Sequence, residues 1–120
     1  MAKVRWAERA RDDLREIYDF IARDSLRAAE ALVERVLHST GCLASFPESG
    51  RTVPEVPDLG YRELLVGSYR IWYRIEKETV WIVTVLHGRR LPGLPGVIRG
   101  FNEEPDGTKS YRRGATELRP

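Results

Sequence analysis

Two arginines flank a tryptophan in the run "YRIWYRI", residues 69–75. Alternate side chains of a strand point to opposite faces, so Arg70, Trp72 and Arg74 share one face and the tyrosines and isoleucines share the other. The second set is an ordinary core face. The first set is unusual, because a solvated face seldom needs a tryptophan and a buried face seldom tolerates two arginines. Since tryptophan and arginine are enriched at interface cores, this face is expected to be accessible and to bind a partner.

A second group of residues that could do chemistry consists of Arg70, His87 and Arg90. His87 ends the next apolar run, residues 80–87, and Arg90 follows it. Arg70 and Arg90 could place positive charge on a phosphate. His87 is the one plausible proton carrier near them in the sequence. A plain strand-end histidine that hydrogen-bonds to a loop is an equally good interpretation. Strict alternation along the run places His87 toward the face of Arg70, together with three apolar residues, Trp81, Val83 and Val85.

Several other classes of site are excluded by what the sequence lacks. No group of His, Cys and Asp has metal-ligand spacing, and the glycines stand singly, so neither a metal nor a cofactor is expected. The single cysteine, Cys42, excludes an internal disulfide and predicts a reducing, cytoplasmic location. No apolar run approaches the length of a membrane span, and the N-terminus lacks the apolar region of a secretory signal.

The charge is distributed unevenly along the chain. Residues 1–48 hold eight Lys and Arg against nine Asp and Glu, whereas residues 60–90 hold six against three. The basic part coincides with the predicted strands. A basic sheet face could meet nucleic acid or an acidic protein partner, although so small an excess favours neither strongly.

Hydrophobic periodicity positions these residues on a small α+β domain. Apolar residues at helical spacing predict helices over residues 8–22 and 26–44, joined closely enough to pack as an antiparallel hairpin. A proline-rich loop, residues 47–60, leads to three strands of an antiparallel meander at residues 61–66, 69–75 and 80–87. Residues 4–6 form a possible edge strand. The hairpin covers one face of the sheet, and the other needs the C-terminal segment or a partner.

The organisation predicted for the whole chain is one domain over residues 1–98 and a polar tail over residues 99–120. Val97 and Ile98 could add a short terminal strand. The tail lacks hydrophobic periodicity, so it is expected to be flexible or a non-native extension.

The order of these elements and four motifs resemble one known family. The motifs "DLREIYDFIARDS", "FPESGRTVPE", "YRELLVGSYRIWYRI" and "VTVLHGRR" are similar to those of the RelE/ParE toxins of type II toxin–antitoxin systems, over about residues 3–92. The resemblance implies a helix hairpin on an antiparallel sheet. It also implies one of two activities, because RelE-like members cleave ribosome-bound messenger RNA and ParE-like members poison DNA gyrase.

The resemblance assigns residues to the ribonuclease activity only in part. Arg70 falls on the arginine of the family's third strand, and Arg90 falls on the arginine that follows the last strand. The second-strand lysines are absent, with Arg62 the nearest basic residue, and "LPGLPG" replaces the tyrosine expected after Arg90. These departures favour a ParE-like, non-enzymatic toxin that inhibits gyrase. A ribonuclease with Arg70, His87 and Arg90 in its site is the alternative, as is an inactive binding module.

The resemblance also implies a cognate antitoxin with an acidic segment that wraps the toxin. We expect this antitoxin to cover the unusual face described above, and we expect the end of the last strand, Arg89 and Arg90, to contact the target. The residues expected to bind the antitoxin are Arg70, Trp72, Arg74, Trp81, Val83 and Val85.

Overall fold

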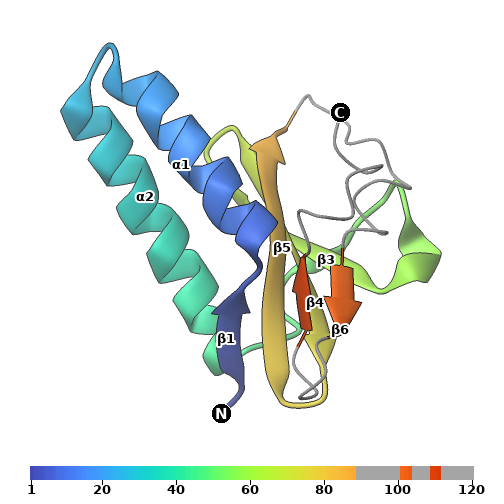
Figure 1. Ribbon diagram of the computed structural model, residues 1–120. Coiled ribbons are helices and arrows are strands. Elements are labelled where there is room, and N and C mark those ends of the chain that lie inside the picture. The colour runs from blue at the N-terminus through green and yellow to red at the C-terminus, as the bar shows by residue number, and fades with distance from the viewer. Residues whose placement is uncertain (89–100, 104–108, 112–120) are drawn as a thin grey trace.

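A helix hairpin packed on one face of a five-stranded sheet forms the body of the protein, as a computed structural model shows (Figure 1). The structure describes residues 1–88 and the backbone of residues 101–103 and 109–111. Along the chain the elements are β1 (Lys3–Trp6), α1 (Glu8–Ala22), α2 (Leu26–Gly41), the 3-10 turn η1 (Cys42–Ala44), β2 (Arg51–Thr52), the 3-10 turn η2 (Pro57–Leu59), β3 (Tyr61–Val66), β4 (Tyr69–Glu76), β5 (Thr79–His87), β6 (Phe101–Glu103) and β7 (Lys109–Tyr111).

The predicted α+β class is confirmed, with one correction to the sheet. Its strand order is β1-β5-β4-β3-β2, and β3, β4 and β5 form the expected antiparallel meander. The edge strand β1 runs parallel to β5, so the sheet is mixed and not purely antiparallel. Because the hairpin and three other strands separate β1 from β5 in the chain, no tight turn forces them into antiparallel pairing.

The hairpin follows the predicted periodicity closely. Ser25 caps α2, since its hydroxyl oxygen accepts a hydrogen bond from the backbone N–H of Ala28 at 3.1 Å. The α-helix ends at Gly41, earlier than the predicted residue 44, and the chain continues as the η1 turn. Leu43 in that turn is buried in the core, so it satisfies the apolar pattern without remaining in an α-helix.

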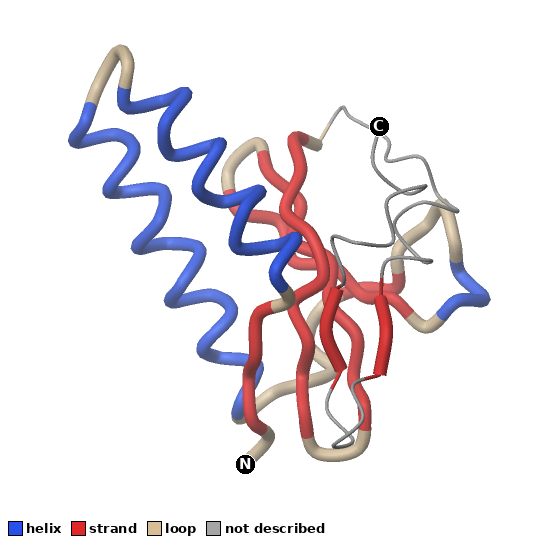
Figure 2. The backbone as a smooth tube through the Cα atoms, viewed as in Figure 1, coloured by secondary structure: helices blue, strands red, loops and turns tan. Residues whose placement is uncertain are grey.

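The sheet has a hydrophobic core on each face. The helix-side core includes Ala10, Val36, Ile71, Tyr73 and Ile82. The core on the other face consists of Ala7, Val53, Val56, Tyr61, Trp72, Val83 and Leu86. Part of this second core comes from residues 53–60, called the strap below, whose η2 turn lies across the strands from the hairpin in Figure 2. The chain therefore covers much of its second face with its own loop.

A β-bulge changes which residues of β5 face the strap. Trp72 pairs with Thr84, but Tyr73 pairs with Ile82, so Val83 is an extra residue in β5. The bulge reverses the alternation beyond it. Val85 joins the helix-side core, and the prediction that it shares a face with Val83 is wrong. His87 pairs with Tyr69, whose side chain packs against the helix-side core. The register therefore places His87 on the face opposite to that of Arg70, and the prediction that the two share a face is wrong.

Asp13 of α1 holds the bulged strand. Its carboxylate accepts hydrogen bonds from the hydroxyl of Thr84 at 2.5 Å and from the backbone N–H of Val85 at 3.1 Å. Arg9 lies 3.2 Å from the other carboxylate oxygen. Burial raises the pKa of Asp13, and the hydrogen bonds and Arg9 oppose that rise without cancelling it.

The predicted tail contains two short strands. β6 and β7 pair in a separate antiparallel sheet, and the backbone of β7 lies against α1 and β5. The division of the chain at residue 98 stays a prediction. The expected strand at Val97 and Ile98 lies outside the described residues. Among the helices that the structure describes, none is long and apolar enough to span a bilayer.

Candidate functional site

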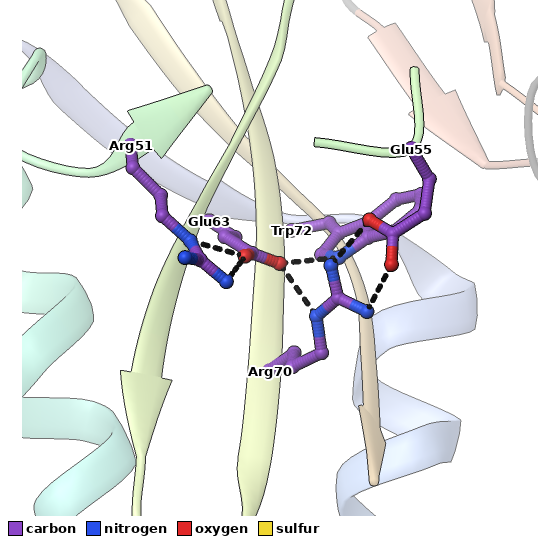
Figure 3. A network of polar contacts seen from close by, with 5 residues as sticks. All are labelled: Arg51, Glu55, Glu63, Arg70 and Trp72. Atoms are coloured by element: carbon purple, nitrogen blue, oxygen red, sulfur yellow. Dashed lines mark hydrogen bonds and ion pairs between the residues drawn. The ribbon is translucent and has the colours of Figure 1, made fainter. Parts of the chain in front are cut away.

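The unusual face of β4 meets carboxylates of the same chain. Three N–H groups of Arg70 donate hydrogen bonds within the network drawn in Figure 3. Nε donates to Glu63 at 2.7 Å, and the two Nη atoms donate to the two carboxylate oxygens of Glu55 at 3.0 and 2.7 Å. Arg70 therefore donates two parallel hydrogen bonds to Glu55 of the strap and a third to Glu63 of β3.

Glu63 is the fully buried centre of this network. One of its oxygens accepts hydrogen bonds from Arg70 and, at 3.0 Å, from the indole N–H of Trp72. The other accepts a bond from Arg51 at 2.6 Å. A buried carboxylate is costly unless it is paired and hydrogen-bonded, and Glu63 has both kinds of compensation.

The electrostatics of the network favour the charged forms of Glu55 and Arg70. The hydrogen bonds with Arg70 lower the pKa of Glu55 below its usual value. The same bonds, with further help from Glu63, raise the pKa of Arg70 above its already high value. Arg70 also lies over the Trp72 ring, 5.5 Å from its centroid. The residues form an ion-paired cluster, with two arginines balanced by two glutamates.

The predicted accessible face is therefore wrong for two of its three members. Arg70 is 5% exposed and Trp72 is 1% exposed. Arg74 is partly buried, with its guanidinium over the Tyr61 ring and an ion pair to Glu76 at 3.0 Å. Whether these residues contact an antitoxin is not tested by their burial. The signal for the pairing was present in "GRTVPE" and "YRELLV", which supply Arg51, Glu55 and Glu63.

A recess of about 470 Å³ borders this network. Arg70 and His87 both line it, so the structure brings together two of the three residues assigned to a ribonuclease. The His87 ring packs edge-on against Tyr69, with centroids 5.5 Å apart. Arg89 and Arg90 lie outside the described residues. The remaining lining residues are Arg51, Glu55, Leu65, Gly67, Ser68, Tyr69 and Gly88.

A larger groove of about 730 Å³ lies along the hairpin and the β1 edge. Its floor is apolar, and three arginines line it. Arg11 is tethered there by a hydrogen bond to the backbone oxygen of Trp6 at 3.1 Å. Of the residues predicted to bind a partner, Trp81 lines this groove. The lining consists of Arg5, Trp6, Arg11, Leu14, Arg15, Tyr18, Val33, Leu37 and Trp81. Sequence periodicity missed the groove, because it counted Leu14 and Leu37 as ordinary core positions.

Neither recess contains a metal site among the described residues, where no three His, Cys, Asp or Glu residues are grouped to hold an ion. The lining residues of the two recesses carry guanidinium, carboxylate and hydroxyl groups, one imidazole and apolar surface.

Comparison with known proteins identifies the family of this chain. The model of the ParE toxin of the type II toxin–antitoxin system parDE matches residues 4–92. The chain belongs to this toxin family. Toxin RelE2 of Caulobacter vibrioides is 37% identical over 92 residues, which are 76% of this chain and all of that toxin. Toxin ParE1 of Mycobacterium tuberculosis H37Rv is 35% identical over 82 residues, which are 67% of this chain and 83% of that toxin.

A solved structure supports the fold. The chromosomal ParDE toxin–antitoxin system from P. aeruginosa contains a chain that matches with a TM-score of 0.61 at 20% identity, covering 72% of this chain and 96% of that one. The ParE-family chain is thus a toxin of a type II toxin–antitoxin system with the α+β fold of its relatives. Its relatives carry both ParE and RelE names.

Proposed function

We propose that this toxin inhibits DNA gyrase by binding it and does not cleave RNA. The supporting observation is the state of Arg70, the residue that a RelE-like ribonuclease would use to hold a phosphate. Its guanidinium is buried and bonded to two carboxylates. An RNA phosphate approaching Arg70 would meet the negative charge of Glu55, which already occupies two of its donors.

The chemical requirements of RNA cleavage also favour binding over catalysis at this site. Attack by the 2′-oxygen needs a group to take a proton, a group to return one, and positive charge on the phosphate. Within the described residues, the Arg70 recess supplies one imidazole, that of His87, the hydroxyls of Ser68 and Tyr69, and two arginines, Arg51 and Arg70, whose charges are balanced by Glu55 and Glu63. This set suits a binding surface better than a catalytic site.

RNA cleavage is the second candidate, favoured by the relative named RelE2 and by the shared recess of Arg70 and His87. Two assays on the purified toxin separate the candidates. We expect gyrase supercoiling to be inhibited and ribosome-bound messenger RNA to remain intact by primer extension. A codon-dependent cut that is lost in His87→Ala would reject the proposal. Absence of growth arrest in every permissive host would instead indicate an inactive binding module.

The partner of this toxin is proposed to be a cognate antitoxin that binds in the larger groove. An acidic amphipathic segment matches the groove, because apolar side chains would cover Leu14 and Leu37 while carboxylates met the arginines. The antitoxin would then lie along the hairpin and reach Trp81, one of the six residues predicted to contact it.

Leu37 allows a direct test of this partner site, because it lines the groove and is 51% exposed. Leu37→Asp should weaken antitoxin binding by at least about tenfold, since it places a charge in the apolar floor. Leu26→Asp is the matched control, an exposed leucine of the same helix outside the groove. Equal affinities of the two variants by calorimetry would exclude the groove.

A further inference from the structure

The bond between Glu55 and Arg70 can be separated from the rest of the network. Glu63 has partners of its own, since Arg51, the Nε of Arg70 and the indole of Trp72 all donate to it. Glu55 accepts its side-chain hydrogen bonds from the two Nη atoms at the outer end of the guanidinium, and it also has a bond with its own backbone. Removing the Glu55 carboxylate would therefore leave the buried part of the network intact.

Glu55 is also placed where a carboxylate can leave. Its side chain is 29% exposed, and it lies in the strap between two apolar anchors, Val53 and Val56, that are buried against the sheet. The anchors hold the strap backbone, so the Glu55 side chain can rotate without uncovering Trp72.

The vacated position would be an oxyanion site. Arg70 lines the recess of about 470 Å³, whose lining also includes Arg51, Ser68 and His87. The Arg51 side chain is 57% exposed, so its charge can reach solvent as well as Glu63. Carboxylates and phosphates both accept two parallel bonds from one guanidinium, so Glu55 holds the place that either group would take.

We propose that Glu55 is a built-in occupant of an oxyanion-binding recess at Arg70, which an external phosphate or carboxylate group can take over when the side chain turns away. With Glu55 in place the cluster holds two positive and two negative charges; with Glu55 withdrawn it carries one net positive charge. The strap thus keeps the recess closed to anions in the resting protein. This inference concerns anion binding and does not require toxicity, but it bears on the proposed function, because an RNA phosphate is kept from Arg70 only while Glu55 stays in place.

Glu55→Gln tests the inference, because it removes the charge and keeps the shape. Inorganic phosphate is titrated at constant ionic strength into the full chain labelled with ¹⁵N, and the signals of the Arg70 Nε–H and the Gly67 and Gly88 amides are followed. Glu55→Gln should bind phosphate at least about tenfold more tightly than the unmodified protein. A parallel titration with acetate identifies the source: binding of phosphate alone indicates phosphate groups, and equal binding of acetate indicates acidic side chains.

Asp58→Asn is the matched control, because Asp58 is an exposed acid of the same strap outside the recess. It should leave phosphate binding as weak as in the unmodified protein. The proposal is overturned if folded Glu55→Gln binds neither anion at these signals, or if Asp58→Asn gains as much affinity. Should Glu55→Gln fail to fold, Glu55→Ala, which keeps both apolar anchors of the strap, makes the same comparison.

Discussion

At the scale of single residues, Glu63 allows two arginines and a tryptophan to meet inside the protein. It is directly opposite Trp72 in the β3–β4 register, so its carboxylate projects into the buried face. There it receives bonds from Arg51, Arg70 and Trp72. A side chain that is polar in the sequence is thus a core residue in the fold.

Glu63→Gln should lower the free energy of unfolding by about 3 kcal/mol, because it leaves the buried Arg70 guanidinium without its inner counter-charge. Urea denaturation measures this value. Glu76→Gln is the comparison, since its ion pair with Arg74 is only partly buried and should contribute less than about 1 kcal/mol. If the two variants lose equal stability, the Glu63 network is not a structural centre.

Asp13 predicts a pH dependence of stability with a definite sign. Its pKa is raised in the folded protein, so the folded state holds the proton more strongly than the unfolded chain. As pH rises above 3.8, the ordinary pKa of an aspartate side chain, this carboxylate makes folding progressively less favourable until pH passes its folded pKa. Asp13→Asn cannot ionise, and its amide oxygen can still accept from Thr84 and Val85. The variant should therefore gain stability relative to the unmodified protein across that window, as urea denaturation at a series of pH values would measure. A loss of stability in Asp13→Asn across that pH window would contradict the predicted direction of the pH dependence.

At the scale of elements, the strap and the bulge decide what the sheet presents. The segment that leads into the strap contains Gly50, whose backbone N–H donates to the Tyr73 hydroxyl at 2.9 Å. That hydroxyl donates in turn to the backbone oxygen of Pro47 at 2.7 Å. The central strand β4 thereby fixes the start of the loop that covers it.

Gly50→Ala should lower the free energy of unfolding by about 1–3 kcal/mol, because an added Cβ would come within 2.7 Å of the Glu63 backbone oxygen and the Tyr73 ring. Gly41→Ala is the control. A Cβ at Gly41 meets nothing within 4 Å, and alanine is a better helix former than glycine. Thermal denaturation of the pair should show a loss at residue 50 and none at residue 41. Equal behaviour would mean that the strap tolerates displacement at its start.

At the scale of the whole molecule, the proposed surfaces are separate. The groove lies along the hairpin and β1, and the oxyanion recess lies beside the strap. Strand β5 ends at His87, which lines that recess. An antitoxin segment in the groove could thus leave the end of β5 open. Antitoxin binding and target binding should accordingly respond to different substitutions.

Charge reversal at Arg89 and Arg90 should abolish growth arrest while leaving thermal stability and antitoxin affinity nearly unchanged. The physical reason is that two arginines that follow β5 in the sequence would add a salt-dependent attraction to gyrase or to its DNA. Truncation after Arg99 is the companion variant and should still arrest growth, because the family match ends at residue 92. Growth arrest by the charge-reversed protein, together with an inert truncated protein, would place the active surface in the tail.

The sequence by itself determined the helices, the three meander strands and the family, because all of these depend on local periodicity and on motifs whose residues are close in the chain. Only the tertiary structure decided which face of the sheet each side chain occupies and which side chains it meets there. One extra residue at Val83 moved Val85 to the helix side, and no alternating pattern contains such a bulge. Likewise, the carboxylates that neutralise Arg70 lie 7 and 15 residues away from it along the chain. Only folding β3 and the strap against β4 brings these charges together, and their pairing inside the chain closes a face that the residue types alone had predicted to be open.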